Sequence, residues 1–236
     1  MAQAPSLANK DTQNKGAHAC PVCLHATTCE FMTLDERTYL RCPVCECTFL
    51  TPSQRPNRLA EVAEYRLHRN DIYDAGYRHF LSGLTKPLLA RLRGKQYGLD
   101  YGCGPGPALA IMLREAGHQI ALYDPVFFND PNVLKRQYDF ITCTEVAEHF
   151  HHPAHEFQRL NKLLKHNGIL AIRTQFQTDD TAFANWRYRH DPTHVVFYRE
   201  NTFRVLAQQF KWQCEIPAPN VVFMRKPPIE MAYSEI

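Results

Sequence analysis

The stretch Leu99–Gly106 reads LDYGCGPG and decides how the chain folds. It lies between Tyr97–Tyr101, a short run that predicts a strand, and Ala108–Ala116, which predicts a helix that Gly117 stops. The three glycines in the turn allow a sharp change of chain direction and let a ligand approach the backbone closely. The sequence therefore predicts a ligand site in the loop that joins this strand to this helix.

The same alternation of strands and helices continues through the rest of the chain. Further strands are predicted over Gln119–Tyr123, Tyr138–Cys143 and Ile169–Thr174, with Val221–Arg225 as a final edge strand. Further helices are predicted over Pro153–Lys165, closed by the C-cap pair Asn167–Gly168, and over Asn201–Phe210. Strands that alternate with helices indicate an α/β fold with a mostly parallel sheet covered on both faces.

Two acidic residues flank the glycine loop and indicate its ligand. Asp124 ends the next predicted strand, eighteen residues after Gly106, at the position that bonds ribose hydroxyls in Rossmann-type units. Asp100 ends the first strand just before the glycines, and the spacing is G-x-G-x-G instead of the dinucleotide-binding G-x-G-x-x-G. With these features, residues from about Gly94 to Lys226 resemble the class I S-adenosylmethionine-dependent methyltransferases, whose first motif is D-x-G-x-G-x-G.

This resemblance implies an enzyme that uses S-adenosyl-L-methionine and a Rossmann-like, mostly parallel, seven-stranded sheet. The residues expected in the cofactor site are Asp100, Gly102, Cys103, Gly104, Gly106, Asp124 and Thr144. By the resemblance, the glycines approach the amino-acid part of the cofactor, Asp124 binds the ribose, and Asp100 lies near the methionine end. The alternative is a glycine-rich turn without a ligand, for which several matching features would have to coincide.

Six of the nine cysteines fall within one short N-terminal segment. Its two C-P-V-C motifs contain Cys20, Cys23, Cys42 and Cys45. Each motif presents two thiolates on one side of a tight turn, and four sulfurs at this spacing predict a structural zinc ion in a zinc ribbon. Cys29 and Cys47 are either alternative ligands or small buried thiols, and His25 lies nearby. A redox role is the alternative for the paired motifs, although redox C-x-x-C sites normally occur singly.

A cluster of acidic and histidine side chains follows the predicted strand Tyr138–Cys143. Glu145, Glu148 and His149 are spaced i, i+3 and i+4, so on a helical turn they would share one face at the carboxyl end of the strand. Two carboxylates and an imidazole can bind a divalent metal. A fourth ligand is expected from the loop histidine His194.

The pattern E-x-x-E-H with a later loop histidine resembles two groups of metal-assisted O-methyltransferases. One group acts on the terminal 2′-hydroxyl of small RNAs and the other in the ubiquinone pathway. The resemblance implies that Glu145, Glu148, His149 and His194 hold Mg²⁺ or Mn²⁺, which would bind adjacent substrate hydroxyls and lower the pKa of one. In the metal-free alternative the carboxylates support loops or cofactor contacts, and His149 or His194 is the general base. The catalytic candidates are His149, His194 and Glu145.

The chain divides into four predicted parts. They are a disordered tail (1–17), a zinc ribbon (18–52), a helical connector or lid (53–94) and the Rossmann-like methyltransferase domain (95–236). Two segments, Tyr65–Tyr73 and Asn185–His190, mix aromatic and cationic residues. Both are candidates for a lid over an anionic or planar substrate, with helix packing and solvated arginines as the alternative.

The composition is that of an ordinary soluble globular chain. Of 236 residues, 44% are hydrophobic, and the net charge of +3 neither demands nor excludes a nucleic-acid partner. No signal peptide and no membrane-spanning stretch is visible, so no membrane partner is expected. The expected location is the cytoplasm, where thiols are kept reduced.

The predicted function is methyl transfer from S-adenosylmethionine to an oxygen of an unidentified acceptor, either a small molecule or an RNA. The alternatives are N- or C-methylation without a catalytic metal, and a non-catalytic scaffold that binds zinc or nucleic acid. The zinc ribbon has few basic residues, Arg37 and Arg41 among them, which argues against an RNA reader. The intact glycine loop and Asp124 argue against a scaffold. The oligomeric state does not follow from the sequence.

Overall fold

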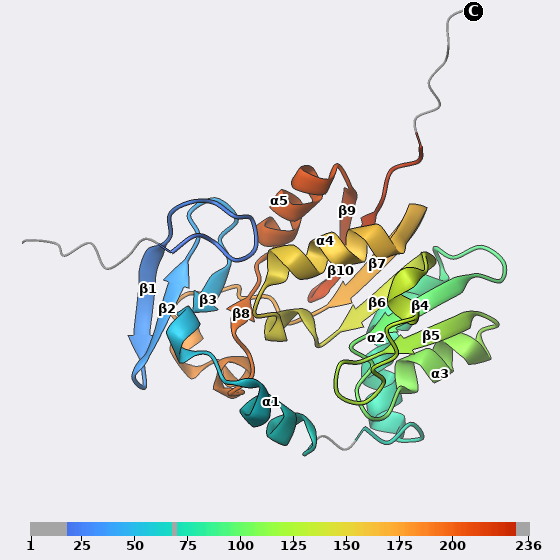
Figure 1. Cartoon of the computed structure of the whole chain (residues 1–236), viewed down its shortest axis with the longest axis horizontal. Helices are drawn as coiled ribbons and strands as arrows, with labels where there is room; N and C mark the ends of the chain where they lie inside the picture. Colours follow the sequence, from blue (N-terminus) through green and yellow to red (C-terminus); the bar gives the residue numbers. More distant parts are fainter. Residues whose placement is uncertain (1–17, 68–69, 230–236) are drawn as a thin grey trace, which may run out of the picture.

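The main sheet is built from six strands within the part of the chain that the structure describes. The structure is a computed structural model that describes residues 18–67 and 70–229, so the expected tail lies outside the described residues. The strands are β4 (Tyr97–Tyr101), β5 (Gln119–Tyr123), β6 (Tyr138–Thr144), β7 (Leu164–Arg173), β9 (Gln213–Ala218) and β10 (Val221–Arg225). Their order is β5-β4-β6-β7-β10-β9, with β5, β4, β6 and β7 parallel and β10 antiparallel to both neighbours. The sheet is therefore mostly parallel, as the alternating pattern predicts (Figure 1).

The prediction of seven strands is wrong for this sheet. Two parallel strands in one sheet need a crossover connection of about a dozen residues or more. Between β5 and β6 the chain has only residues 124–137, which form a turn closed by the bridge from Asp124 to Phe128 and the short 3₁₀ helix η2 (Val133–Lys135). This connection has no room for a helix and a further strand. As a result β5 is an edge strand.

The carboxyl-terminal strands also differ from the prediction. Val221–Arg225 is strand β10, but it lies between β7 and β9 instead of at the edge. The edge strand is β9, in which exposed and half-buried residues alternate and which contains Pro217. A proline cannot donate to a central ladder, so it is tolerated at an edge. A tight turn with a φ of +67° at Asn220 joins the two strands.

Helices cover both faces of the sheet. They are α2 (Ala75–Leu89) and α3 (Ala108–Glu115) on one face, and α4 (Pro153–Leu163) and α5 (Glu200–Phe210) on the other. Successive residues of a strand point to opposite faces, so Ile169 and Ala171 of β7 belong to the core under α2 and α3. Leu170 and Ile172 belong to the core under α4 and α5. The continuous apolar run Ile169–Ile172 within β7 is thus what a strand buried on both faces requires.

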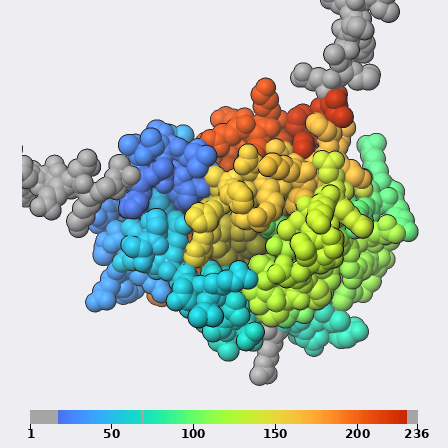
Figure 2. Space-filling model, in the orientation of Figure 1, coloured from blue at the N-terminus to red at the C-terminus, as the bar shows by residue number. Residues whose placement is uncertain are grey.

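The N-terminal residues 18–50, here called the cysteine module, form a second and smaller sheet. Its strands β1 (Cys29–Leu34), β2 (Arg37–Arg41) and β3 (Thr48–Leu50) are antiparallel. A fourth strand, β8 (Val196–Phe197), comes from the other half of the chain and pairs with β3. The module is the blue body of Figure 1, and Figure 2 shows it packed against segments that come much later in the chain. The small sheet is therefore shared between the module and the methyltransferase body.

A short helical connector leads from the module to α2. It comprises η1 (Pro52–Gln54) and α1 (Arg58–Tyr65), and Asn57 caps α1 by accepting a hydrogen bond from the amide of Ala60 at 3.0 Å. Among the described residues, no helix combines the length and the apolar character that a membrane crossing requires.

Candidate active site

The loop after β4 is fixed by hydrogen bonds to the end of β5. The amide of Gly102 donates to the carbonyl of Tyr123 at 2.7 Å, and the amide of Gly104 donates to Asp124 Oδ2 at 3.0 Å. Gly102 and Gly104 have φ angles of +78° and +63°, which favour glycine. Asp124 Oδ1 accepts from two amides of its own turn. The aspartate assigned to ribose binding therefore also holds the glycine loop in shape.

Two other segments close on this loop. A Cβ atom on Gly102 would lie 2.5 Å from Cγ2 of Val146, which follows β6. A Cβ atom on Gly106 would lie 1.8 Å from the backbone oxygen of Asn70, which precedes α2. Gly106 is therefore required by its neighbour and not by its own backbone angles. The glycine loop, the turn after β6 and the segment before α2 meet at one point.

A cavity of about 740 Å³ opens at the carboxyl ends of β4, β5 and β6. Its lining includes every residue assigned to the cofactor from the sequence: Asp100, Gly102, Cys103, Gly104, Gly106, Asp124 and Thr144. It also includes the three catalytic candidates Glu145, His149 and His194. Ligand pockets typically measure about 300–1,000 Å³. The structure thus brings the cofactor candidates and the catalytic candidates to a single site of suitable size.

Asp100 lies at the end of β4 with its carboxylate buried. Thr142 Oγ1 donates a hydrogen bond to Asp100 Oδ1 at 2.8 Å. Burial raises the pKa of Asp100 to about 6, and the hydrogen bond from Thr142 opposes that rise. A cationic group bound in the cavity would favour the charged form of this carboxylate.

One wall of the cavity was not marked by any sequence motif. Helix α1 contributes Arg58, Glu61, Val62 and Tyr65, and helix α2 contributes Tyr77, Phe80 and Leu81. The amphipathic spacing of these helices was their only signal, and it does not distinguish a cavity wall from a core. In the candidate lid segment Tyr65–Tyr73, Tyr65 and Asn70 line the cavity and Tyr73 is exposed, while residues 68 and 69 lie outside the described residues.

The second candidate lid segment, Asn185–His190, does not line the cavity. It spans the end of η4 (Phe183–Asn185) and the whole of η5 (Arg187–His190), and Tyr188 and Arg189 within it are buried. Arg189 donates to the carbonyl of Ala184 at 2.8 Å and to Asp35 of the cysteine module at 3.1 Å. The lining of the cavity resumes at Asp191 and His194. The packing alternative therefore describes this segment better than a lid.

Glu148, His149 and His194, here called the ligand group, converge beside the glycine loop. Their ligand atoms all lie within 4.8 Å of one another, and the Nε2 atoms of both imidazoles lie 4.0 Å from Glu148 Oε1. His149 Nδ1 lies 3.1 Å from the carbonyl oxygen of Thr193, and His194 Nδ1 lies 2.7 Å from that of Tyr188. A carbonyl only accepts, so Nδ1 carries the proton in each ring and Nε2 is left as the basic atom.

Glu148 is buried with only one of its two carboxylate oxygens hydrogen-bonded among the described residues. Its side chain is fully buried, and burial raises its pKa, while the charge of His194 lowers it. Oε2 accepts a hydrogen bond from Thr174 at 2.8 Å, but Oε1 has no hydrogen-bond partner among the described residues. A buried, unpartnered carboxylate oxygen is costly unless a cation completes it. Imidazoles held at Nδ1 by carbonyls are also the usual arrangement around a protein-bound metal.

Glu145 is placed differently from the prediction. The 3₁₀ helix η3 (Ala147–His149) begins only after it, and its own φ is +51°, so Glu145 shares no helical face with the ligand group. Its carboxylate accepts from Tyr188 Oη at 3.2 Å and lies 3.7 Å from Arg173 Nε. Burial, and secondly the charge of Glu148, raise the pKa of Glu145 to about 8. Its roles as a metal ligand and as a catalytic residue stay predictions.

The four cysteines of the two C-P-V-C motifs form a second cluster. Their sulfur atoms lie within 4.8 Å of one another, with 3.6 Å between those of Cys20 and Cys45 and 3.5 Å between those of Cys23 and Cys42. Zn–S bonds of about 2.3 Å in a tetrahedron separate the sulfurs by about 3.8 Å, so the four thiols fit a zinc ion. Cys47 is buried with its sulfur 3.5 Å from that of Cys20.

Comparison with known proteins identifies the family of this chain. The family model described as a methyltransferase domain matches residues 73–215. No curated protein sequence gives a significant match. Among solved structures, an O-methyltransferase family protein from Burkholderia thailandensis is 15% identical with a TM-score of 0.48, covering 64% of this chain and 57% of that chain. A 1,6-didemethyltoxoflavin-N1-methyltransferase from the same organism is 16% identical with a TM-score of 0.49, covering 84% and 99%.

The match to the family model agrees with the geometry of the loop after β4. It includes the glycine loop, the acidic ends of β4 and β5, and the ligand group. The structural similarities are too distant to add to this assignment. Because residues 73–215 make up more than half of the 236 residues, the chain belongs to the methyltransferase-domain family and is a class I S-adenosylmethionine-dependent methyltransferase.

Proposed function

We propose that this enzyme transfers the methyl group of S-adenosylmethionine to an oxygen of an acceptor whose hydroxyl is held at the ligand group. The observation that carries the proposal is the convergence of Glu148 Oε1 with the Nε2 atoms of His149 and His194. Val146 connects this group to the cofactor loop, since its side chain fills the space beside Gly102. His149 and His194 line the same cavity as the glycine loop, which supports direct displacement between a bound acceptor and a bound cofactor.

In this proposal the cofactor is held by the glycine loop and its two acids. Asp124 is the acceptor for the ribose hydroxyls, and Asp100 lies near the methionine end. Each oxygen of Asp124 already accepts from backbone amides, and a carboxylate has further lone pairs for hydroxyl donors. The α1 and α2 side chains form one wall of this cavity.

A divalent cation such as Mn²⁺ or Mg²⁺ fits the donor set of one carboxylate and two imidazoles. Glu148 Oε1 and the Nε2 atoms of His149 and His194 would hold it. When bound, it would supply Lewis acidity that lowers the pKa of a nearby acceptor hydroxyl. The chain's own residues orient both imidazoles through backbone carbonyls and keep Glu148 dry. In the metal-free alternative, His149, which is more exposed than Glu148, would receive the hydroxyl proton at Nε2.

We further propose that Cys20, Cys23, Cys42 and Cys45 hold a structural zinc ion. Backbone amides of Cys23, Val44 and Cys45 approach the sulfurs of Cys20 and Cys42 at 3.4–3.5 Å, which stabilises thiolates. A closed site of four sulfurs has no open position for catalysis, so its role is structural. Reduced thiols also fit the expected cytoplasmic location.

Calorimetric titration with S-adenosylhomocysteine and Mn²⁺ tests the proposal. The zinc-loaded protein is expected to bind both. Asp124→Ala is expected to weaken the binding of S-adenosylhomocysteine at least tenfold. Glu148→Gln is expected to weaken the binding of Mn²⁺ at least tenfold and to leave the binding of S-adenosylhomocysteine unchanged. A tenfold change corresponds to about 1.4 kcal/mol. If Glu148→Gln leaves Mn²⁺ binding unchanged, the metal site fails, and His149 as a metal-free general base takes its place.

A further inference from the structure

The segment that carries His194, residues 186–199, is here called the histidine loop. It lies between the turn that carries Glu148 and the cysteine module. The amide of Val195 donates to the carbonyl of Glu148 at 2.9 Å, while the carbonyl of Val195 accepts from the amide of Leu50 in β3 at 2.9 Å. The residue after His194 is therefore bonded to the ligand group on one side and to the cysteine module on the other.

A strand pair extends this contact. Beyond Val195 the loop becomes β8, in which Val196 pairs with Phe49 and Phe197 pairs with Thr48 of β3. All four side chains are buried. The position of the histidine loop is therefore set by the register of a sheet whose other strands belong to the cysteine module.

A second connection between the histidine loop and the cysteine module is made by the guanidinium group of Arg189, a residue that is only 3% exposed. It donates to Asp35 Oδ2 at 3.1 Å and to Tyr39 Oη at 3.4 Å, both in the cysteine module. It also donates to the carbonyl of Ala184 within the methyltransferase body at 2.8 Å. The residue before Arg189 is Tyr188, whose carbonyl accepts from His194 Nδ1. Arg189 thus holds the backbone that orients the His194 ring.

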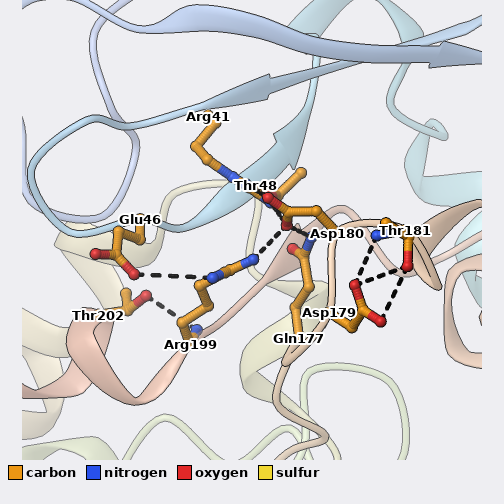
Figure 3. Close-up of polar contacts among 9 residues, drawn as sticks. All are labelled: Arg41, Glu46, Thr48, Gln177, Asp179, Asp180, Thr181, Arg199 and Thr202. Atoms are coloured by element: carbon orange, nitrogen blue, oxygen red, sulfur yellow. Dashed lines mark hydrogen bonds and ion pairs between the residues drawn. The ribbon is translucent and has the colours of Figure 1, made fainter.

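The third tie lies at the far end of the loop (Figure 3). The Asp180 carboxylate accepts two hydrogen bonds from the Arg41 guanidinium, with N–O distances of 2.6 and 2.7 Å. It accepts a further hydrogen bond from Arg199, the last residue of the loop. Thr202, one turn into α5, donates to the carbonyl of Cys45 at 2.8 Å. The loop is therefore tied to the module at its start, in its middle and at its end.

We infer that the cysteine module positions His194 for the ligand group, and that Arg189 is the positioning residue that transmits this. The inference rests on the proposed function for its catalytic consequence. Packing alone would not call for a buried guanidinium, because an apolar side chain of similar volume fills such a space at no cost of desolvation. The planar guanidinium group of Arg189 instead bonds to two side chains of the cysteine module and to one backbone carbonyl of the methyltransferase body. These directional bonds fix the orientation of the module relative to the body.

The test compares Arg189→Met with Arg187→Met, an exposed arginine two residues away on the same short helix. Arg189→Met is expected to weaken Mn²⁺ binding at least tenfold, the lower end of the usual effect of groups that support metal ligands. Binding of S-adenosylhomocysteine should change by less than twofold, and zinc content should stay at one per chain. Arg187→Met should match the wild type, and Arg189→Lys should lie between.

Hydrogen exchange separates this inference from the proposed function. Without any added Mn²⁺, amides of residues 190–198 are expected to exchange at least tenfold faster in Arg189→Met than in the wild type. If the wild type binds no Mn²⁺ but this exchange difference appears, the proposed metal site fails and the positioning by the module stands. Unchanged exchange together with unchanged Mn²⁺ binding would overturn the inference.

A milder pair of variants covers the case in which Arg189→Met does not fold. Asp35→Asn removes the charged partner of Arg189 and keeps a residue type that tolerates its φ of +49°. Glu36→Gln makes the same charge change at the next exposed residue of that turn. Mn²⁺ binding weakened two- to fivefold in Asp35→Asn alone supports the inference, and equal behaviour of the two variants contradicts it.

Discussion

Two backbone carbonyls decide which nitrogen each histidine of the ligand group offers. The carbonyl that faces His149 Nδ1 belongs to Thr193, which is 44 positions away in the sequence. The one that faces His194 belongs to Tyr188. The spacing of Glu148 and His149 marked them as neighbours, but the direction of their rings depends on these distant contacts. The left-handed backbone conformation of Glu145 could not be predicted either, because the local spacing of the residues suggests a helix there.

The glycine loop shows the opposite case, in which local sequence was sufficient. Gly102, Gly104 and Asp124 were predicted to lie together, and all three line one cavity, while their roles toward the cofactor stay a prediction. Residues 53–94 were predicted as a helical connector or lid, but apart from Tyr65 the residues of α1 and α2 that line this cavity were not assigned to the site, since their apolar spacing is equally typical of a core. The residues of a motif can therefore be predicted to lie together, whereas spacing alone does not distinguish a cavity wall from a core.

Gly106 permits a prediction at this scale. Gly106→Ala places a methyl group 1.8 Å from the oxygen of Asn70, so the backbone before α2 has to move. We expect a loss of about 1–3 kcal/mol in the free energy of unfolding and at least tenfold weaker binding of S-adenosylhomocysteine. Urea denaturation and calorimetry measure the two effects. Gly76→Ala, whose methyl would meet only the Asp74 side chain at 3.3 Å, is the control and should leave that binding unchanged.

At the scale of elements, short strands bounded by turn residues were predictable. Strands β4, β5 and β10 have the predicted bounds. The two-residue β8 and the proline-containing β9 were missed, because neither has a periodic pattern long enough to recognise. The seventh strand was expected from the family resemblance, and the short connection after β5 excludes it. The topology of a family can thus mislead where a connection is shortened.

Between β2 and the histidine loop, the Asp180 carboxylate accepts hydrogen bonds from Arg41 and Arg199. Hydrogen bonds from Arg41 lower its pKa, and the charge of Arg199 adds to this. A lowered pKa in the folded state means that the stabilisation is present above the unfolded value near 3.9 and is lost as the pH falls below it. Asp180→Asn should therefore destabilise the protein by about 1 kcal/mol or less at pH 7, because Asp180 is half exposed, and by less still at pH 3.

Thermal unfolding at the two pH values measures this difference. The comparison of variant and wild type at each pH removes the general effect of acid on the rest of the chain. A deficit of the same size at pH 3 and pH 7 would show that the carboxylate charge is not what joins these elements.

At the scale of the whole molecule, the cysteine module and the cofactor site lie at different ends of one continuous structure. The module is tied to the histidine loop and to α5, whereas the glycine loop is tied to β5 and to the turn after β6. The ligand group lies between them. Its two halves are contributed separately, since Glu148 and His149 follow β6 and His194 precedes β8. Loss of structure in the cysteine module should therefore displace His194 more than it displaces the glycine loop.

Removal of zinc provides the corresponding prediction. The protein is stripped with a zinc-selective chelator, which is then dialysed away, and is titrated with Mn²⁺ and with S-adenosylhomocysteine. Without zinc, four buried thiols lose the bonds that hold the module together. We expect Mn²⁺ to bind at least tenfold more weakly, S-adenosylhomocysteine to bind less than tenfold more weakly, and one equivalent of Zn²⁺ to restore both. Equal losses for the two ligands would mean that zinc supports the whole fold, and unchanged Mn²⁺ binding would mean that the module holds His194 without it.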